Sequence, residues 1–404
     1  MKETPHSLEL SAQELSIRNR PGFSRLPLVA AGVGLLGVLI SVLLGLGSKQ
    51  LVWASYLISC LFFLSLGLGS LFFVLVQFAS RAGWSVVVRR LAEHAMGTLP
   101  LVAILTVPLC LGLHELYPWS RGEVLAQDAL LGHRAVYLNS SFFFLRSLIY
   151  LLSWTIIAWW FRSQSLRQDL SGGGGVTRRL QAASGPALVW FGLTVTFAAF
   201  DWIMSLDPHW YSTIFGVYFF SGCVVAGLAF LVLVIVVLQQ QGFLIRAVTF
   251  EHLHDLGKLL FGFTVFWAYI AFSQFLLIWY ANLPEETEWY ACLLENGWEP
   301  VTVLLVLGHF VVPFFFLLPR DIKRRRSTLL AAAIWLLVMH YLDLYWLVMP
   351  NFHPGSLPGL GDLATLVAVG GLFTSWLSML LRRGALVPMR DPRLQESLSF
   401  ENLI

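Results

Sequence analysis

The sequence predicts an all-α integral membrane protein with about ten transmembrane helices. Hydrophobic residues make up 57% of the 404 residues and charged residues only 12%. Apolar runs of 18 or more residues recur along the whole chain, and a helix needs about 20 such residues to cross a bilayer. If the N-terminus lies inside, 22 of the 26 Lys and Arg residues fall on the inner side. The positive-inside rule therefore predicts that both termini are cytoplasmic.

Ten spans follow one another with short connections, so we expect a single transmembrane domain of residues 26–384. Residues 1–25 are polar and mixed in charge, which predicts a cytoplasmic N-terminal tail and no cleavable signal peptide. Residues 385–404 are predicted to form a cytoplasmic C-terminal tail, in solvent or on a partner. The expected spans are Leu26–Gly47, Leu51–Phe78, Met96–Leu116, Phe142–Phe161, Gly185–Ser205, Thr213–Leu238, Leu256–Tyr280, Trp298–Leu318, Leu329–Met349 and Leu363–Leu381.

Cysteine spacing argues against a metal or cofactor held by cysteines of this chain. The four cysteines do not form a CxxC or CxxCH motif, which excludes a cysteine zinc site, an internal iron–sulfur cluster and attached c-type haem. We expect no cofactor bound by the chain itself and no metal.

The stretch 197–222 joins two spans and places acidic residues at their junction. A carboxylate inside a bilayer costs a few kcal/mol on insertion scales, so Asp201, about one turn inside span five, needs a role. Arg146 lies at a similar depth in span four, and pairing would neutralise both charges. The pair is either structural or linked to proton movement. Asp207, followed by Pro208, is predicted to cap the next helix.

Span nine carries a second polar group, since His340 and Asp343 are three residues apart on one helix face. His114, Arg146, Asp201 and Asp343 are all expected at one depth, which predicts a polar cavity opening outward. His340 and Asp343 are candidates for a proton relay, and the alternative is a satisfied polar contact between helices.

His309 lies near the middle of span eight. It is a candidate proton relay, a hydrogen-bond partner between helices, or a ligand with His340 for a b-type haem. At the inner end of span seven, the segment EHLHDLGK gathers charges that form either an inner proton entrance or a charged helix start at the interface. The entrance candidates are Glu251, His254, Asp255 and Lys258.

Four segments resemble one family. They are FDWIMSLDPHWYSTIFGVYFFSG (200–222), FWAYIAFSQFLLIWYANLPEETEWY (266–290), PRDIKRRR (319–326) and HYLDLYWLVMPNF (340–352). They resemble the F subunit of alternative complex III, a bacterial quinol:electron-acceptor oxidoreductase, within the NrfD/polysulfide-reductase-like membrane subunits.

The resemblance implies two four-helix bundles plus two flanking helices in the bacterial inner membrane. It implies a complex with a paralogous NrfD-like membrane subunit, an iron–sulfur protein and c-type cytochromes, so that haem c and iron–sulfur clusters belong to the partners. Such a complex oxidises menaquinol and reduces a cytochrome c, a copper protein or an attached oxidase. The quinol site is generally placed in the paralogous subunit, and whether this chain binds a quinone stays open.

Two other functions compete with a proton-handling subunit of a redox complex. An independent proton-coupled transporter would show matched helix breaks in two halves, whereas Pro27, Pro108 and Pro313 do not match in this way. A purely structural anchor would satisfy all its polar residues internally. The chain is thus expected to be a non-catalytic or quinone-interacting subunit.

Overall fold

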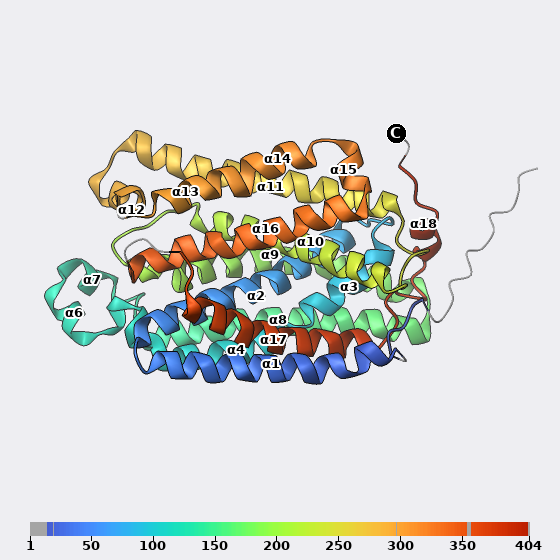
Figure 1. Ribbon diagram of the computed structural model, residues 1–404, viewed down its shortest axis with the longest axis horizontal. Coiled ribbons are helices and arrows are strands. Elements are labelled where there is room, and N and C mark those ends of the chain that lie inside the picture. Colours follow the sequence, from blue (N-terminus) through green and yellow to red (C-terminus); the bar gives the residue numbers. More distant parts are fainter. Residues whose placement is uncertain (1–13, 19, 296, 354–356, 403–404) are drawn as a thin grey trace, which may run out of the picture.

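The computed structural model describes residues 14–18, 20–295, 297–353 and 357–402. All regular structure in this part of the chain is helical, and ten of its helices are long and apolar enough to cross a membrane. These helices run alongside one another (Figure 1). The predicted all-helical, multi-span fold is therefore confirmed.

Six spans of the described chain are formed by single long helices, and four contain irregular turns or short extensions. The single helices are α1 (Pro21–Gly45), α2 (Lys49–Ala79), α8 (Ser140–Ser171), α10 (Phe215–Gln240), α11 (Phe250–Ala281) and α17 (Leu360–Arg382), which has a capped start. The others are α3 (Val86–Met96) with α4 (Leu99–Thr106), η1 (Val107–Gly112) and α5 (Leu113–Leu116); α9 (Gly174–Trp202) with η3 (Met204–Leu206); α13 (Glu299–Leu305) with η4 (Val306–Val311) and α14 (Val312–Leu317); and α16 (Arg326–Val348) with η5 (Met349–Asn351).

The two ends of the bundle differ. The end we call the loop end carries η2 (Pro118–Ser120), α6 (Gly122–Gln127), α7 (Ala129–Arg134) and α12 (Pro284–Glu295). The other, the tail end, carries α15 (Arg320–Arg324), α18 (Leu394–Leu398) and the segments near both termini (Figure 1). These two segments touch, because Leu386 N donates to Leu15 O at 2.9 Å.

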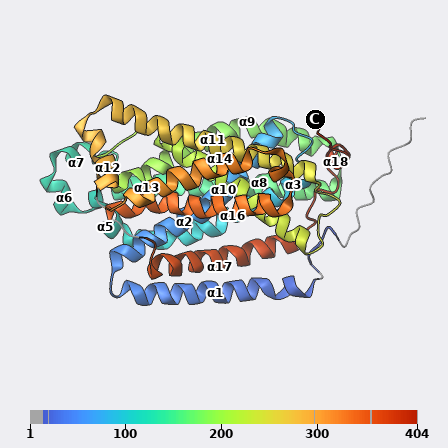
Figure 2. The ribbon, with the colours of Figure 1, turned by 45° about the horizontal axis from the view of Figure 1, so that its top comes forward.

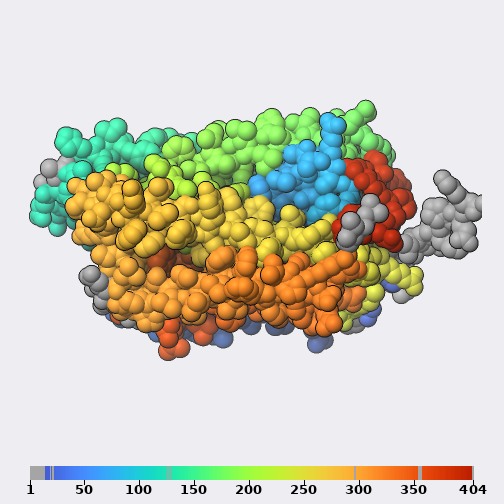
Figure 3. Space-filling view, turned by 90° about the horizontal axis from the view of Figure 1, so that it is seen from above, coloured from blue at the N-terminus to red at the C-terminus, as the bar shows by residue number. Residues whose placement is uncertain are grey.

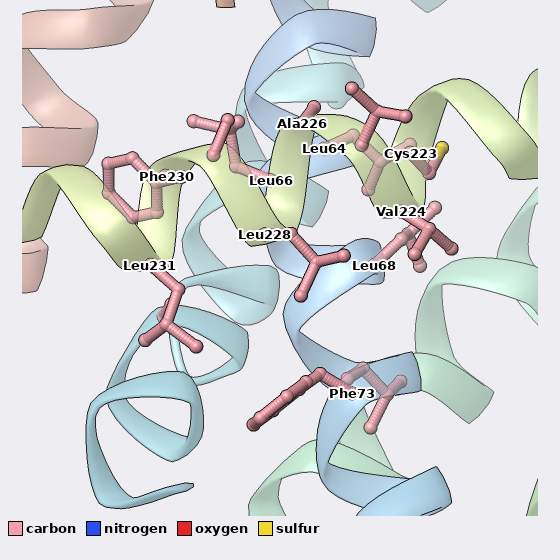
Figure 4. Close-up of a cluster of buried hydrophobic side chains, with 14 of the residues drawn as sticks. Leu64, Leu66, Leu68, Phe73, Cys223, Val224, Ala226, Leu228, Phe230 and Leu231 are labelled. Atoms are coloured by element: carbon pink, nitrogen blue, oxygen red, sulfur yellow. The ribbon is translucent and has the colours of Figure 1, made fainter. Parts of the chain in front are cut away.

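The centre of the bundle is the crossing of α2 and α10. Figure 4 shows the leucine, valine and phenylalanine side chains of these two helices packed together, including Leu66 and Leu228. The backbones approach closely at Gly69 and Gly227, where a Cβ on Gly227 would lie 2.6 Å from the Gly69 carbonyl carbon. In a membrane, close packing of small residues is a main source of helix association.

Helices α1 and α17 form a flank of the molecule (Figure 2). Gly37 of α1 lies against the backbone of Ala368 of α17, where an added Cβ would meet its nitrogen at 2.6 Å. The other face of α1 exposes large apolar side chains, among them Leu28 and Leu35. Such a face is typical of contact with lipid.

The third span starts at Val86, ten residues earlier than predicted, so Arg89 and Arg90 lie in a helix and not in a loop. Both side chains are buried. Arg89 Nη2 lies 2.5 Å from Asp391 Oδ2 of the C-terminal segment, and Arg90 Nη1 lies 2.6 Å from Asp169 Oδ2 of α8. The prediction missed this start because two adjacent arginines resemble a polar loop.

The C-terminal segment packs on the chain itself, which corrects the prediction of a tail in solvent or on a partner. Leu394 and Leu398 are buried. Ser397 Oγ donates to Trp84 O at 2.5 Å and accepts from Val87 N at 3.2 Å. Of the predicted N-terminal tail, residues 1–13 lie outside the described residues, and helix α1 already begins at Pro21.

The close crossing predicts a steric effect at Gly227. Gly227→Ala should lower the stability of the folded protein by about 1–3 kcal/mol, because the new methyl group meets backbone atoms of Gly69 that cannot rotate away. The midpoint of thermal unfolding in detergent measures it. Gly262→Ala in α11 is the control, since a Cβ there meets nothing within 4 Å. Equal midpoints for the two variants would contradict the prediction.

Candidate functional site

Asp343 of α16 is buried and is held by neutral donors from two other helices. The Tyr218 hydroxyl of α10 donates to Oδ1, and Trp267 Nε1 of α11 donates to Oδ2 at 3.2 Å. Within the described residues, no Lys or Arg forms an ion pair with this carboxyl group. A buried carboxyl group without a cation partner is suited to taking up and releasing a proton.

His340 lies one turn from Asp343 on α16 and is also buried. Its Nε2 lies 2.8 Å from Ser65 Oγ of α2, while Nδ1 has no hydrogen-bond partner among the described residues. A Cβ on Gly222 would lie 3.2 Å from this Nδ1 and 3.9 Å from Asp343 Oδ2. Glycine at 222 thus lets the imidazole and the carboxyl group approach the same point.

His309 joins the same site through a break in its helix. Its ring stacks on Trp267 with centroids 3.8 Å apart, and neither ring nitrogen has a described hydrogen-bond partner. Pro313 has no N–H to give to the His309 carbonyl, and residues 306–311 form a π-helix. Trp335 Nε1 donates to Gly308 O at 2.6 Å. Because neither ring nitrogen has a partner among the described residues, no hydrogen bond between helices is made by His309, and the relay and haem alternatives stay predictions.

A cavity of about 620 Å³ reaches this site from the surface of the bundle. It lies between α11, α12 and the span of α13 and η4, and Figure 3 shows α11 and this span side by side. Tyr218 and Trp267, the two donors to Asp343, form part of its wall. Apolar walls with a few polar groups are typical of small-molecule sites. The other lining residues that carry polar groups are Tyr269, Gln274, Tyr290, Thr302 and Trp346.

The predicted pair of Arg146 and Asp201 is present. Arg146 Nε and Nη2 each donate to one Asp201 oxygen at 2.8 Å, and Tyr150 Oη donates to Oδ2 at 2.9 Å. Arg146 Nη1 also donates to Tyr137 O at 3.0 Å. Asp201 is fully buried, and this fork of hydrogen bonds is what a buried ion pair requires. The geometry favours the structural alternative for this pair.

The described contacts do not gather the four ionisable residues predicted to line one outward cavity into a single cluster. Asp201 and Asp343 share no hydrogen-bond partner among the described contacts, because one is held by α8 and the other by α10 and α11. His114 is exposed, and its Nδ1 bonds Ser120 Oγ at 3.0 Å. Of the four residues, Arg146 and Asp201 form one pair, whereas His114 and Asp343 contact other residues.

The predicted inner entrance is a closed cluster at the tail end. Glu251 pairs with Arg324 at 2.6 Å, and Asp255 pairs with Lys258 at 2.5 Å. Asn402 of the C-terminal segment donates to Glu251 at 2.8 Å and to Asp255 at 3.1 Å. His254 is buried, with no described partner at Nδ1. The cluster ties the C-terminal segment to the start of α11.

Asp207 does not cap a helix, because α10 begins only at Phe215. Its Oδ1 accepts from His209 N at 3.1 Å and so stabilises a turn. His209 Nε2 in turn lies 2.6 Å from Asp128 Oδ2, and Asp128 caps α7 through the amides of Leu130 and Leu131. The hydrogen bonds from His209 and from the Leu131 amide hold the pKa of Asp128 below its usual value.

Sequence reasoning missed the residues that hold Asp343 and His340. Tyr218 and Trp267 lie inside two of the segments quoted for the resemblance, and a tyrosine and a tryptophan within spans are a usable signal. Ser65, within LFFLSLG, carries no such signal, because serine is common in membrane helices.

The fold and the site define a multi-pass helical membrane protein with a buried acid–base cluster beside a cavity. No family model matches the chain, and no curated protein matches it. Its function is therefore argued from the site and from the resemblance of the four segments.

Loss of the Asp201 carboxylate should destabilise the protein. Asp201→Ala leaves the Arg146 charge buried without its partner, which costs about 3–5 kcal/mol for a buried pair. The thermal unfolding midpoint in detergent should fall sharply, and replacing both residues by Leu and Met should recover part of the loss. Asp207→Ala, in a partly exposed turn, is the control. A midpoint for Asp201→Ala equal to that of the control would contradict the structural role.

The contact between Asp128 and His209 should weaken in acid. Because folding depresses the pKa of Asp128, its stabilisation is complete above the ordinary carboxyl value and is lost as pH falls through the lower folded value. Hydrogen exchange at the Leu130 and Leu131 amides should therefore accelerate at acidic pH beyond its intrinsic change. His209→Gln should bring this acceleration to higher pH; identical profiles for the two proteins would refute the contact's role.

Proposed function

We propose that the chain is a membrane subunit of a quinol-oxidising electron-transfer complex of the alternative complex III type. Its task is to anchor the redox subunits and to handle the protons of quinol oxidation. One observation carries the proposal: the buried Asp343 is held by Tyr218 and Trp267, and both side chains also line a cavity of about 620 Å³. A proton acceptor thus lies directly behind two side chains of the wall of a largely apolar cavity.

The chemistry of a quinol suits such a site. Its oxidation releases two protons and two electrons, so it needs a base beside the ring and an electron acceptor nearby. Asp343 would take the proton through Tyr218, whose hydroxyl can accept one proton while it donates another. The electrons would pass to the haem c and iron–sulfur clusters of partner subunits. The aromatic wall, with Trp267 and Trp346, suits a flat ring such as that of menaquinol.

The same proposal includes the arrangement in the membrane. The contacts support one bundle built from α2, α3–α5, α8 and α9 and another from α10, α11, α13–α14 and α16, with α1 and α17 on the flank. The tail end would face the cytoplasm of the bacterial inner membrane, as its arginines and lysines favour. The loop end would face the redox partners and a paralogous membrane subunit.

Isolation from the native membrane tests the assembly. The proposal expects the chain to copurify with c-type haem and iron–sulfur subunits, seen as haem absorbance and an iron–sulfur electron paramagnetic resonance signal. Isolation as a single active species without these groups would favour the independent transporter.

Asp343→Asn should reduce quinol oxidation while leaving the complex assembled. Loss of a positioned base typically costs about 10²–10⁴-fold in rate. Asparagine keeps the size of the side chain, and its amide oxygen can accept from Trp267 while its NH₂ donates to the Tyr218 oxygen. Steady-state oxidation of a short-chain quinol measures the effect, with haem content as the measure of assembly. Asp207→Asn, in the loop-end turn, is the matched control. Unchanged turnover in Asp343→Asn would leave only a structural anchor.

A further inference from the structure

A line of hydroxyl groups runs along α2 from the loop end to His340. Ser55, Ser59 and Ser65 are all buried. They span ten residues of helix, or about 15 Å. Hydroxyl and carboxyl groups of α16 and α17 face them. We call this set the hydroxyl seam: Ser55, Ser59, Ser65, Tyr341, Asp362 and Thr365.

Each serine of the seam bonds across to a neighbouring helix. Ser55 Oγ donates to Asp362 Oδ1 at 2.6 Å, and Ser59 Oγ donates to Thr365 Oγ1 at 3.0 Å. Ser65 Oγ lies 2.8 Å from His340 Nε2. The seam therefore begins at a carboxylate and ends at the imidazole beside Asp343.

Each serine also has a second acceptor in its own helix. The backbone carbonyls of Leu51, Ser55 and Phe62 lie 2.9, 2.9 and 2.6 Å from the hydroxyls of Ser55, Ser59 and Ser65, respectively. A hydroxyl carries one hydrogen and can donate to only one acceptor at a time. By rotating between the two, it can accept a proton on one side and release one on the other.

The outer end of the seam opens into a cavity of about 260 Å³ at the loop end. Ser55 and Asp362 line it together with the exposed Ser48. Asp362 Oδ2 accepts from Gly359 N at 2.8 Å, which is a helix-capping bond. Capping does not account for the bond of Oδ1 to Ser55, so this carboxylate has a further partner inside the bundle.

The seam has two gaps. On the side of Ser55, Ser59 and Thr365 bond to the backbone carbonyls of Ser55 and Asp362 and not to their side chains, so a water must bridge Ser59 and Ser55. The second gap lies between Ser59 and Ser65. The Phe62 ring lies there, with its centroid 5.6 Å from that of Tyr341 and 6.0 Å from that of His340. A proton must pass when this ring moves or a water enters. Beyond the site toward the tail end, α2 and α10 instead present the apolar cluster of Figure 4, including Leu68 and Phe73.

We propose that the hydroxyl seam is the route by which the Asp343 site exchanges protons with the loop-end surface. A proton from Asp343 passes to Nδ1 of His340, and another leaves Nε2 for Ser65. It then moves past Phe62 to Ser59, crosses to Ser55 through a bridging water, and reaches Asp362 along the bond from Ser55. Water in the cavity then takes it from Asp362. The imidazole of His340 thus gains one proton at Nδ1 and loses one from Nε2, so its charge is unchanged. Its original tautomer is restored by proton exchange at the site. The inference rests on the proposed function only in its use of Asp343 as a proton carrier.

Infrared spectroscopy of the purified protein in lipid tests the route without any quinol. Transfer from H₂O to D₂O shifts the C=O stretching band of a protonated carboxyl group. The band of Asp343 is identified as the one that is missing from the spectrum of Asp343→Asn. The pH is lowered until this band appears. Ser59→Ala should slow its exchange about tenfold, the effect of one lost hydrogen bond on a barrier.

Two variants control for a general loss of structure. Ser59→Thr keeps the hydroxyl and should exchange as fast as the wild type. Ser70→Ala removes another buried serine of α2, which bonds only to Leu66 O at 2.7 Å among the described contacts, and should leave the rate unchanged. Thr365→Val, which removes the acceptor of Ser59, should slow exchange as Ser59→Ala does and replaces it if that protein does not fold.

Two results would overturn the route. One is an unchanged exchange rate in Ser59→Ala and Thr365→Val, and the other is an equal slowing in Ser70→Ala. Either leaves the proposed function untouched, because quinol oxidation is not measured. Conversely, slowed exchange in a protein that does not oxidise quinol would support the route and reject the proposed function.

Discussion

The crossing of α2 and α10 at Gly69 and Gly227 is the constraint on which the polar sites depend. Two glycine backbones meet there without side chains between them, so the two helices stay in contact over their buried length. The same closeness continues at Gly222, where the missing side chain leaves room for His340. A wider crossing would separate Ser65 from the imidazole. Close backbone packing therefore sets the geometry of an acid–base site one to two turns away.

Two buried aspartates show how partners decide what a carboxylate does. Asp201 accepts two hydrogen bonds from the Arg146 guanidinium and one from the Tyr150 hydroxyl. Its charge is therefore neutralised, and both of its oxygens have partners. Among the described contacts, Asp343 accepts hydrogen bonds from two neutral donors, Tyr218 and Trp267. A fixed ion pair resists a change of charge, whereas a carboxylate held by neutral donors changes its charge more easily. This difference is why we propose proton transfer at Asp343 and a structural role for Asp201.

The sequence was enough for the spans and for one pair of partners, because both follow from local or one-dimensional rules. Hydropathy locates the helices, and equal depth on consecutive spans pairs Arg146 with Asp201. The start of α3 could not be predicted from the sequence. Arg89 and Arg90 can be buried there because they pair with Asp391 and Asp169, which lie far along the chain. The hydroxyl seam could not be predicted either, because the partners of its serines also lie far along the chain. A serine in an apolar run gains meaning only from the neighbour that faces it.

Two of the cavities lie beside irregular turns that contain or precede a proline. Pro108 lies in the 3₁₀ turn η1, and Pro313 follows the π-helix η4, because proline lacks the N–H that a regular helix needs. Residues of η1 line a cavity of about 310 Å³, and residues of η4 line the cavity of about 620 Å³ beside Asp343. Irregular turns change the direction of the side chains that follow, so neighbouring helices no longer interlock. At η4 the same change turns His309 onto Trp267, so one proline both opens the cavity and completes the cluster at its wall.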